Sequence, residues 1–191
     1  MGQETKLPKF EGVSLIEIPR DISQANFLVG DFGKYILDEV NSRYNDFLVI
    51  SKIGSYDNKV VSGSNPYFVV AVNEVIKPEG FHVATQAHLE RILKLNKLDL
   101  KEEYEDSALV LRSEEEPNKY LAKHLANQIK TRNVKAKYPL MINLKDLTLE
   151  KDSNAPEGLA FKLTEDSDII YAPILNMGGQ FNSEDIDEKT G

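Results

Sequence analysis

The chain contains no cysteine and no tryptophan, and it has only three histidines. Without cysteine it can form no disulfide, thiolate metal site or iron–sulfur cluster, and it has no cysteine nucleophile. No run approaches the roughly 18 apolar residues that a membrane helix needs. The first residues lack the basic and apolar regions of a secretory signal, and Lys6 stands where a myristoylation signal has Ser or Thr. We therefore expect a cytoplasmic protein with no membrane attachment.

The composition is that of a globular protein, with 191 residues, 41% of them hydrophobic and 28% charged. A chain of this length buries roughly 70% of its unfolded surface. We expect one domain over residues 1–175, followed by an acidic, flexible tail over residues 176–191. The formal net charge of -8 opposes general adhesion to nucleic acid or to an anionic membrane.

The most apolar run, from Tyr67 to Ile76, predicts a buried central strand because it leaves neither face of a strand for water. A second buried strand is predicted at Asp46–Ile53, with a short strand at Lys59–Val61 between the two. Strands and helices alternate from Tyr67 to about Lys145. This alternation predicts right-handed crossover connections and parallel pairing.

Helical periodicity predicts helices at Phe32–Tyr44 and at Pro117–Arg132. It predicts a further helix that begins after Thr85, which is a plausible N-cap. Further strands are predicted at Val13–Ile18, at Ser107–Leu111, and at Pro139–Glu150 with a break at Lys145-Asp146. The alternating run Leu159–Leu163 and the run Asp168–Leu175 suggest a hairpin. The expected fold is therefore α/β, with a mixed, partly parallel central sheet, helices on both faces and a C-terminal β-hairpin.

Positive charge is concentrated in one segment of this acidic protein. Six Lys or Arg residues and no acidic residue lie between Asn118 and Tyr138. Lys119, Lys123 and Lys130 project within about 40° of one another on the predicted helix, and we call them the lysine ridge. Lys135 and Lys137 continue the positive charge past the helix. The ridge is either a solvated helix face or a site for an acidic protein or for nucleic-acid phosphates.

The histidines and glycines match no recognised site. His82, His88 and His124 have no metal-ligand spacing, and we expect surface or boundary positions for them. No dinucleotide fingerprint, phosphate loop or nucleophile elbow occurs.

The predicted order of a helix at Phe32–Tyr44, a strand at Asp46–Ile53 and a strand at Tyr67–Ile76 resembles the core of the restriction-endonuclease-like nucleases. In that family a helix Glu, an Asp after the first strands and a Glu-x-Lys at the end of a buried strand hold Mg²⁺ and activate water. The resemblance places Glu39, Asp57, Glu74 and Lys77 in these roles, with Asp57 and Glu74 as metal ligands.

The match has one departure, because Glu74-Val-Ile-Lys77 is one residue longer than the family motif. In a regular strand Lys77 would point away from Glu74. The same order of elements also fits an inactive relative kept as a binding module, and Glu39 could simply pair with Arg43 one helical turn away.

Two functional hypotheses follow. The first is a non-catalytic interaction or regulatory protein without a cofactor, which binds a partner through Lys119, Lys123, Lys130, Lys135 and Lys137. That partner is expected to be a protein, a second copy of the chain included, and nucleic acid would bind only through the lysine ridge. The alternative is a Mg²⁺-dependent nuclease-like enzyme using Glu39, Asp57, Glu74 and Lys77.

Overall fold

The computed structural model describes residues 15–16, 25–26, 28–44, 55–57, 60–62, 65–89, 106–113, 119–132, 137–156 and 158–171. The contacts divide the chain into two compact units: residues 1–83 with 92–105, and residues 84–91 with 106–191. The prediction of one domain over residues 1–175 stays a prediction, and the tail lies outside the described ranges. No helix within those ranges is long and apolar enough to cross a membrane.

In the first unit, α1 (Gly30–Tyr44) confirms the helix predicted at Phe32–Tyr44 and buries Phe32, Ile36 and Val40. The short strand predicted near Lys59 is also present, as β4 (Val60–Ser62), paired antiparallel with β3 (Ser55–Asp57). A further antiparallel pair is formed by β1 (Leu15–Ile16) and β2 (Ala25–Asn26). β1 lies within the strand predicted at Val13–Ile18, and β2 follows that strand in the sequence. The strand predicted at Asp46–Ile53 lies outside the described residues.

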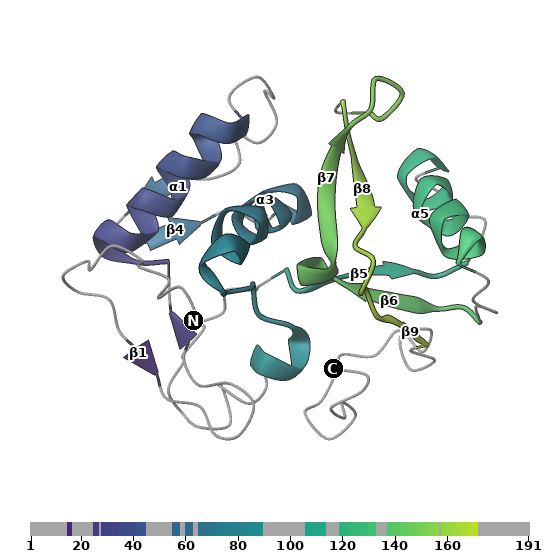
Figure 1. Cartoon of the computed structure of the whole chain (residues 1–191), viewed down its shortest axis with the longest axis horizontal. Coiled ribbons are helices and arrows are strands. Elements are labelled where there is room, and N and C mark those ends of the chain that lie inside the picture. The colour runs from purple at the N-terminus through teal and green to yellow at the C-terminus, as the bar shows by residue number, and fades with distance from the viewer. Residues whose placement is uncertain are drawn as a thin grey trace, which may run out of the picture. The chain divides into compact units, whose positions relative to one another are not determined.

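The prediction of a central strand at Tyr67–Ile76 is wrong, because this run forms the helix α3 (Pro66–Ile76). Asn65 is its N-cap, with the Asn65 Oδ1 accepting a hydrogen bond from the Tyr67 backbone N–H at 2.9 Å, and Pro66 occupies the first turn. Both residues are typical helix-start signals. A helix that is apolar nearly all round is a buried helix, and α3 buries Tyr67, Phe68 and Val70 among others. It lies beside α1 (Figure 1).

The predicted turn through Gly80 follows α3. A single 3₁₀ turn, η1 (Lys77–Glu79), ends at Gly80, whose φ of 82° is in the left-handed region that glycine adopts at little cost. The fully buried Asn73 of α3 accepts a hydrogen bond from the Val83 N–H at 3.0 Å through its Oδ1, which fixes the chain after this turn.

The second unit contains two separate antiparallel sheets. In the first, β6 (Leu140–Asn143) lies between β5 (Ala108–Leu111) and β9 (Ile169–Tyr171). In the second, β7 (Leu147–Lys151) pairs with β8 (Leu159–Leu163). The 3₁₀ turn η2 (Leu144–Asp146) separates β6 from β7, so the break predicted at Lys145-Asp146 is confirmed. Residues 86–89 are helical, and the Thr85 Oγ1 accepts from the His88 N–H as the predicted N-cap.

The helix α5 (Lys119–Thr131) confirms the helix predicted at Pro117–Arg132 and packs on β8 (Figure 1). Its apolar stripe, Leu125 and Ile129 with Ala122 and Ala126, is buried. On the hairpin side, Leu147, Leu159 and Phe161 are buried as well. The core of this unit therefore includes one face of α5 and the strand residues that face inward.

Two predictions about strand pairing are wrong. The hairpin is formed by β7 and β8, whereas β9 leaves β8 and pairs with β6. The described sheets are all antiparallel, so the expected parallel pairing around a single mixed sheet is not found in the described residues. The coarser expectation of an α/β combination holds. The physical reason is that α3 replaces the expected central strand, which removes the crossover connections.

Candidate functional site: the two polar faces of α5

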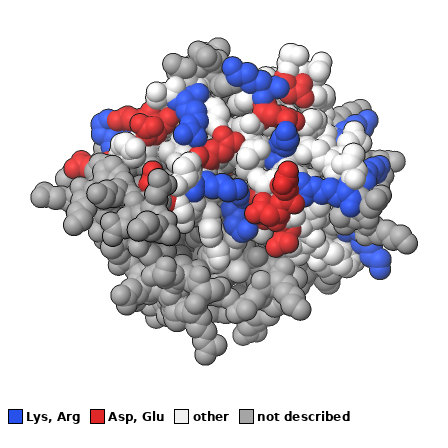
Figure 2. All heavy atoms as spheres, in the orientation of Figure 1, with Lys and Arg blue, Asp and Glu red and all other residues white. Residues whose placement is uncertain are grey.

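The outer face of α5 carries the lysine ridge. Lys123, Asn127 and Lys130 are exposed on the side opposite Leu125 and Ile129. Lys119 is the first residue of α5, but its side chain lies outside the part of the structure that is described. Of the two lysines that continue the charge, Lys137 is exposed and Lys135 lies outside the described residues. Figure 2 shows basic side chains over α5, on the right of the view.

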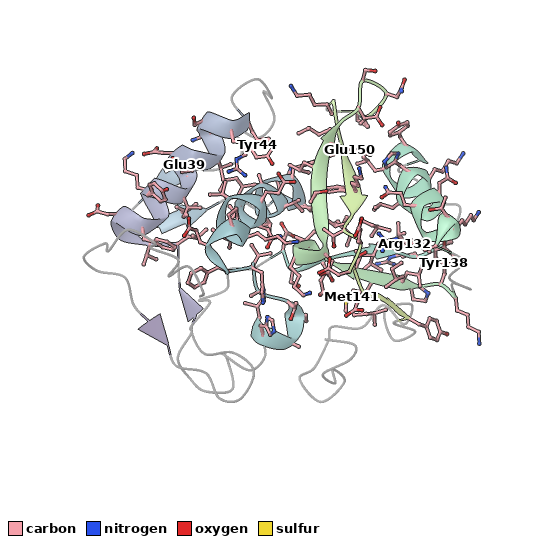
Figure 3. The ribbon with its side chains drawn as sticks, in the orientation of Figure 1. Glu39, Tyr44, Arg132, Tyr138, Met141 and Glu150 are labelled. Atoms are coloured by element: carbon pink, nitrogen blue, oxygen red, sulfur yellow. The ribbon has the colours of Figure 1, made fainter. Side chains whose placement is uncertain are left out.

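A second polar stripe runs along α5 and faces the β7–β8 hairpin. It consists of residues spaced by four positions, which places them on one side of a helix: Tyr120, His124, Gln128 and Arg132. Each of the four side chains contacts the hairpin or the turn after it. Figure 3 shows Arg132 at the end of α5 and Glu150 on β7. This stripe was not predicted from the sequence as a unit, although its four-residue spacing could have indicated it.

Gln128 completes the free edge of β8. Its Nε2 donates to the Phe161 carbonyl at 2.9 Å, and its Oε1 accepts from the Leu163 N–H at 2.8 Å. The side-chain amide thus satisfies one donor and one acceptor, as the backbone of a neighbouring strand would. Arg132 continues this edge by donating to the carbonyls of Leu163 and Thr164 and to the Ser167 hydroxyl.

Near the start of α5 the contacts are with acidic side chains. The Tyr120 hydroxyl donates to the Asp152 carboxylate, and His124 Nε2 lies 2.8 Å from Glu150 Oε1. The hydrogen bond to Asp152 raises the pKa of Tyr120 and lowers the pKa of Asp152. The Tyr120 and His124 rings stack with their centroids 6.1 Å apart. His124 is therefore a boundary residue that bonds the hairpin, in line with the position expected from the sequence.

The four residues of the nuclease-like alternative belong to the first unit. Glu39 lies half-buried on α1, Glu74 lies on α3, and Lys77 is exposed in η1. Asp57 is described only as the last residue of β3, and its side chain lies outside the described part. Because Glu74 and Lys77 belong to a continuous helical segment, the strand end on which the resemblance relied is absent. Their roles in metal-dependent cleavage stay a prediction.

Glu74 is engaged by two residues of α1. The Tyr44 hydroxyl donates to the Glu74 carboxylate, and Arg43 Nη1 donates to the Glu74 backbone carbonyl at 3.0 Å. Burial, followed by the hydrogen bond to Glu74 and its negative charge, raises the pKa of Tyr44 well above its ordinary value. Figure 3 labels Tyr44 together with Glu39, which lies on the same helix. The pair fastens α1 to α3.

A cleft of about 150 Å³ lies beside this contact, and Glu39, Arg43 and Glu79 contribute to its wall together with Tyr35 and apolar residues of α3. Pockets that enclose small-molecule substrates commonly measure about 300 to 1,000 Å³. The cleft is therefore small for a substrate site. In the ranges that the structure describes, no three His, Cys, Asp or Glu side chains gather closely enough to hold a metal ion.

Comparison with known proteins adds no assignment, because no family model, curated protein or solved structure matches the chain.

Proposed function

We propose that this chain is a non-catalytic interaction or regulatory protein that binds an acidic segment of a partner protein through the outer face of α5. The observation that carries the proposal is the separation of charge around this one helix. Its inner polar stripe reaches the acidic Asp152 and Glu150 of the hairpin, while Lys123 and Lys130 are exposed on the outer side.

Two lysines of the ridge, Lys119 and Lys123, lower the stability of α5, which supports a role in binding. The helix contains no acidic residue, so neither of them can form an ion pair within α5. Lys119 and Lys123 are like charges one turn apart, which destabilises a helix by about 0.2 to 0.5 kcal/mol. Lys119 also lies in the first turn, where the helix dipole disfavours positive charge. The favourable end of the dipole benefits only Lys130.

The length of the ridge favours a short acidic peptide over nucleic acid. Lys119 and Lys130 are 11 positions apart, which is about 16 Å along a helix. About five residues of an extended chain span this distance. Non-specific binding to duplex DNA depends on neutralising phosphates along the backbone, and a duplex that extends beyond the ridge is repelled by the rest of a protein with a net charge of -8.

Fluorescence anisotropy with a fluorescein-labelled deca-glutamate peptide tests the proposal. We expect the wild-type chain to bind the peptide, and reversal of Lys119, Lys123 and Lys130 to Glu to weaken binding at least tenfold. The matched control reverses Lys34, Lys77 and Lys151, which are exposed outside α5. Both triple variants change the net charge by the same amount. Apart from this shared effect, we expect the control to change the affinity for the peptide less than twofold at 150 mM salt.

Three results would count against the proposal. One is no binding of the peptide by the wild-type protein, and another is an equal loss of affinity in the control. Tighter binding of a 16-base-pair DNA duplex than of the peptide would make nucleic acid the partner class. Circular dichroism of all three proteins establishes that folding is unchanged.

A further inference from the structure

Buried oxygen atoms without a hydrogen-bond partner are concentrated at one turn of the second unit. In the described residues, five buried side-chain oxygens lack a partner, and four of them belong to residues around η2. Native structures leave few such groups, and each needs a physical explanation such as a bound ion or water. The four atoms are Asp106 Oδ2, Asn143 Oδ1, Asp146 Oδ2 and Thr164 Oγ1.

Backbone contacts bring these residues to the same turn. Asn143 is the N-cap of η2 and Asp146 is its last residue, so the two residues lie at the two ends of one three-residue turn. The Ser107 carbonyl, next to Asp106, accepts from the Leu144 N–H at 2.9 Å. The Asp146 carbonyl accepts from the Thr164 N–H at 3.0 Å. Three segments that are distant in sequence therefore meet at η2.

Burial and charge indicate which kind of ligand these oxygens could bind. Asn143 and Asp146 are each only 4% exposed. Lys145 Nζ lies 2.7 Å from Asp146 Oδ1 and offsets one negative charge, which leaves the second carboxylate, Asp106, in excess. A positively charged ligand with a preference for oxygen would satisfy both the charge and the unpaired atoms.

We propose that η2 binds a hard divalent cation of the Ca²⁺ class through oxygens of Asp106, Asn143, Asp146 and Thr164. Ca²⁺ accepts carboxylate, amide and carbonyl oxygens in flexible geometry, and waters complete its shell. The site has two carboxylates, so it agrees with the finding that no three acidic or histidine side chains gather in the described residues. It is separate from Glu39 and Glu74, which belong to the other unit.

The bound ion would fix the turn that joins the β5–β6–β9 sheet to the β7–β8 hairpin. This hairpin carries Glu150 and Asp152, which bond the inner stripe of α5. The inference does not depend on the proposed function, because it concerns metal affinity and stability and not partner binding.

Isothermal titration calorimetry of the EDTA-treated, dialysed full chain with CaCl₂, and separately with MgCl₂, tests the inference. We expect saturable binding of one Ca²⁺ and a rise of about 5 °C in the melting temperature at a hundredfold excess over Kd. Asp146→Asn should weaken binding at least tenfold. The matched control Asp168→Asn removes an exposed charge from the same unit and should leave Kd within twofold.

Asn143→Leu should change the melting temperature in opposite directions without and with metal. Without metal this variant should melt above the wild type, because it removes a buried oxygen that has no donor. With 5 mM CaCl₂ it should melt below the wild type. If this variant does not fold, Asp106→Asn, at the less buried end of the cluster, replaces it in the calorimetric test.

The inference is overturned if neither Ca²⁺ nor Mg²⁺ up to 10 mM produces binding heat or a melting shift beyond that of NaCl at equal ionic strength. Equal loss of binding in Asp168→Asn and Asp146→Asn would also overturn it, because the ion would then respond only to net charge.

Discussion

At the scale of single residues, the contact between Tyr44 and Glu74 joins α1 to α3. Tyr44 is 7% exposed, and its hydroxyl donates to the Glu74 carboxylate. Hydrogen bonds to charged groups contribute about 1.5 to 3 kcal/mol, more than neutral ones do. The contact is therefore a sizeable part of what holds the two helices together.

Tyr44→Phe should lower the free energy of unfolding by about 1.5 to 3 kcal/mol at pH 7, because it deletes this donor. The pKa of Tyr44 is raised by burial and by Glu74 above its ordinary value of 10.0. The contribution of the hydroxyl is therefore fully present below pH 10 and is lost as the pH rises above it. The difference between wild type and Tyr44→Phe in urea unfolding should shrink between pH 9 and pH 11.

The exposed Tyr171 provides the control, and Tyr171→Phe should have little effect at either pH. Equal unfolding free energies for wild type and Tyr44→Phe at pH 7, or a difference that grows above pH 10, would contradict the role given to this contact.

Exposure of single residues on a helix was predictable, whereas contacts between distant residues were not. The positions of Lys123 and Lys130 opposite Leu125 and Ile129 follow from helical periodicity, which depends only on local spacing. Tyr44 and Glu74 are 30 positions apart, and no local pattern relates them. The same holds for His124 and Glu150, which the structure brings within 2.8 Å.

At the scale of secondary-structure elements, the segment Tyr67–Ile76 shows why an apolar run is ambiguous. A short continuous apolar run fits either a buried strand or a buried helix, and periodicity alone does not separate them. The local signals Asn65 and Pro66 favoured a helix start. A helix satisfies its backbone hydrogen bonds internally, so α3 can be buried without partner strands.

Gln128 tests how α5 is held on the hairpin. Gln128→Ala should lower the free energy of unfolding by about 1 to 3 kcal/mol, because the Leu163 N–H loses its acceptor at the edge of β8. Urea unfolding measures the loss. Amide hydrogen exchange should show faster exchange at Leu163 in the variant.

The neighbouring Asn127 is exposed, so Asn127→Ala is the control and should change stability by less than about 0.5 kcal/mol. If Gln128→Ala and Asn127→Ala are equally stable, and Leu163 exchanges at the same rate in both, the amide does not complete the strand edge.

At the scale of the whole molecule, the elements were more predictable than their pairing. The strands at Ala108–Leu111, Leu140–Asn143 and Leu159–Leu163 follow from apolar patterns. The pairing of β9 with β6 joins residues about 30 positions apart and bypasses β7 and β8. Local pattern favours neighbouring strands as a hairpin, and only the packing of the unit selects the more distant partner.

The distribution of charge over the molecule defines the proposed function. The chain has a net charge of -8, yet residues 119–137 contain six Lys or Arg residues and no acid. At physiological salt, charges separated by more than about 8 Å are largely screened. An acidic segment lying on α5 would therefore respond mainly to the lysine ridge and little to the net charge of the molecule.

The most direct test of this account is chemical-shift mapping of the ¹⁵N-labelled protein with the deca-glutamate peptide. The account predicts saturable shifts at the outer positions of α5, Lys123, Asn127 and Lys130, with smaller changes at Leu125 and Gln128 on the inner side. Saturable shifts confined to β5, β6 or the first unit, or no shifts at any peptide concentration, would contradict it.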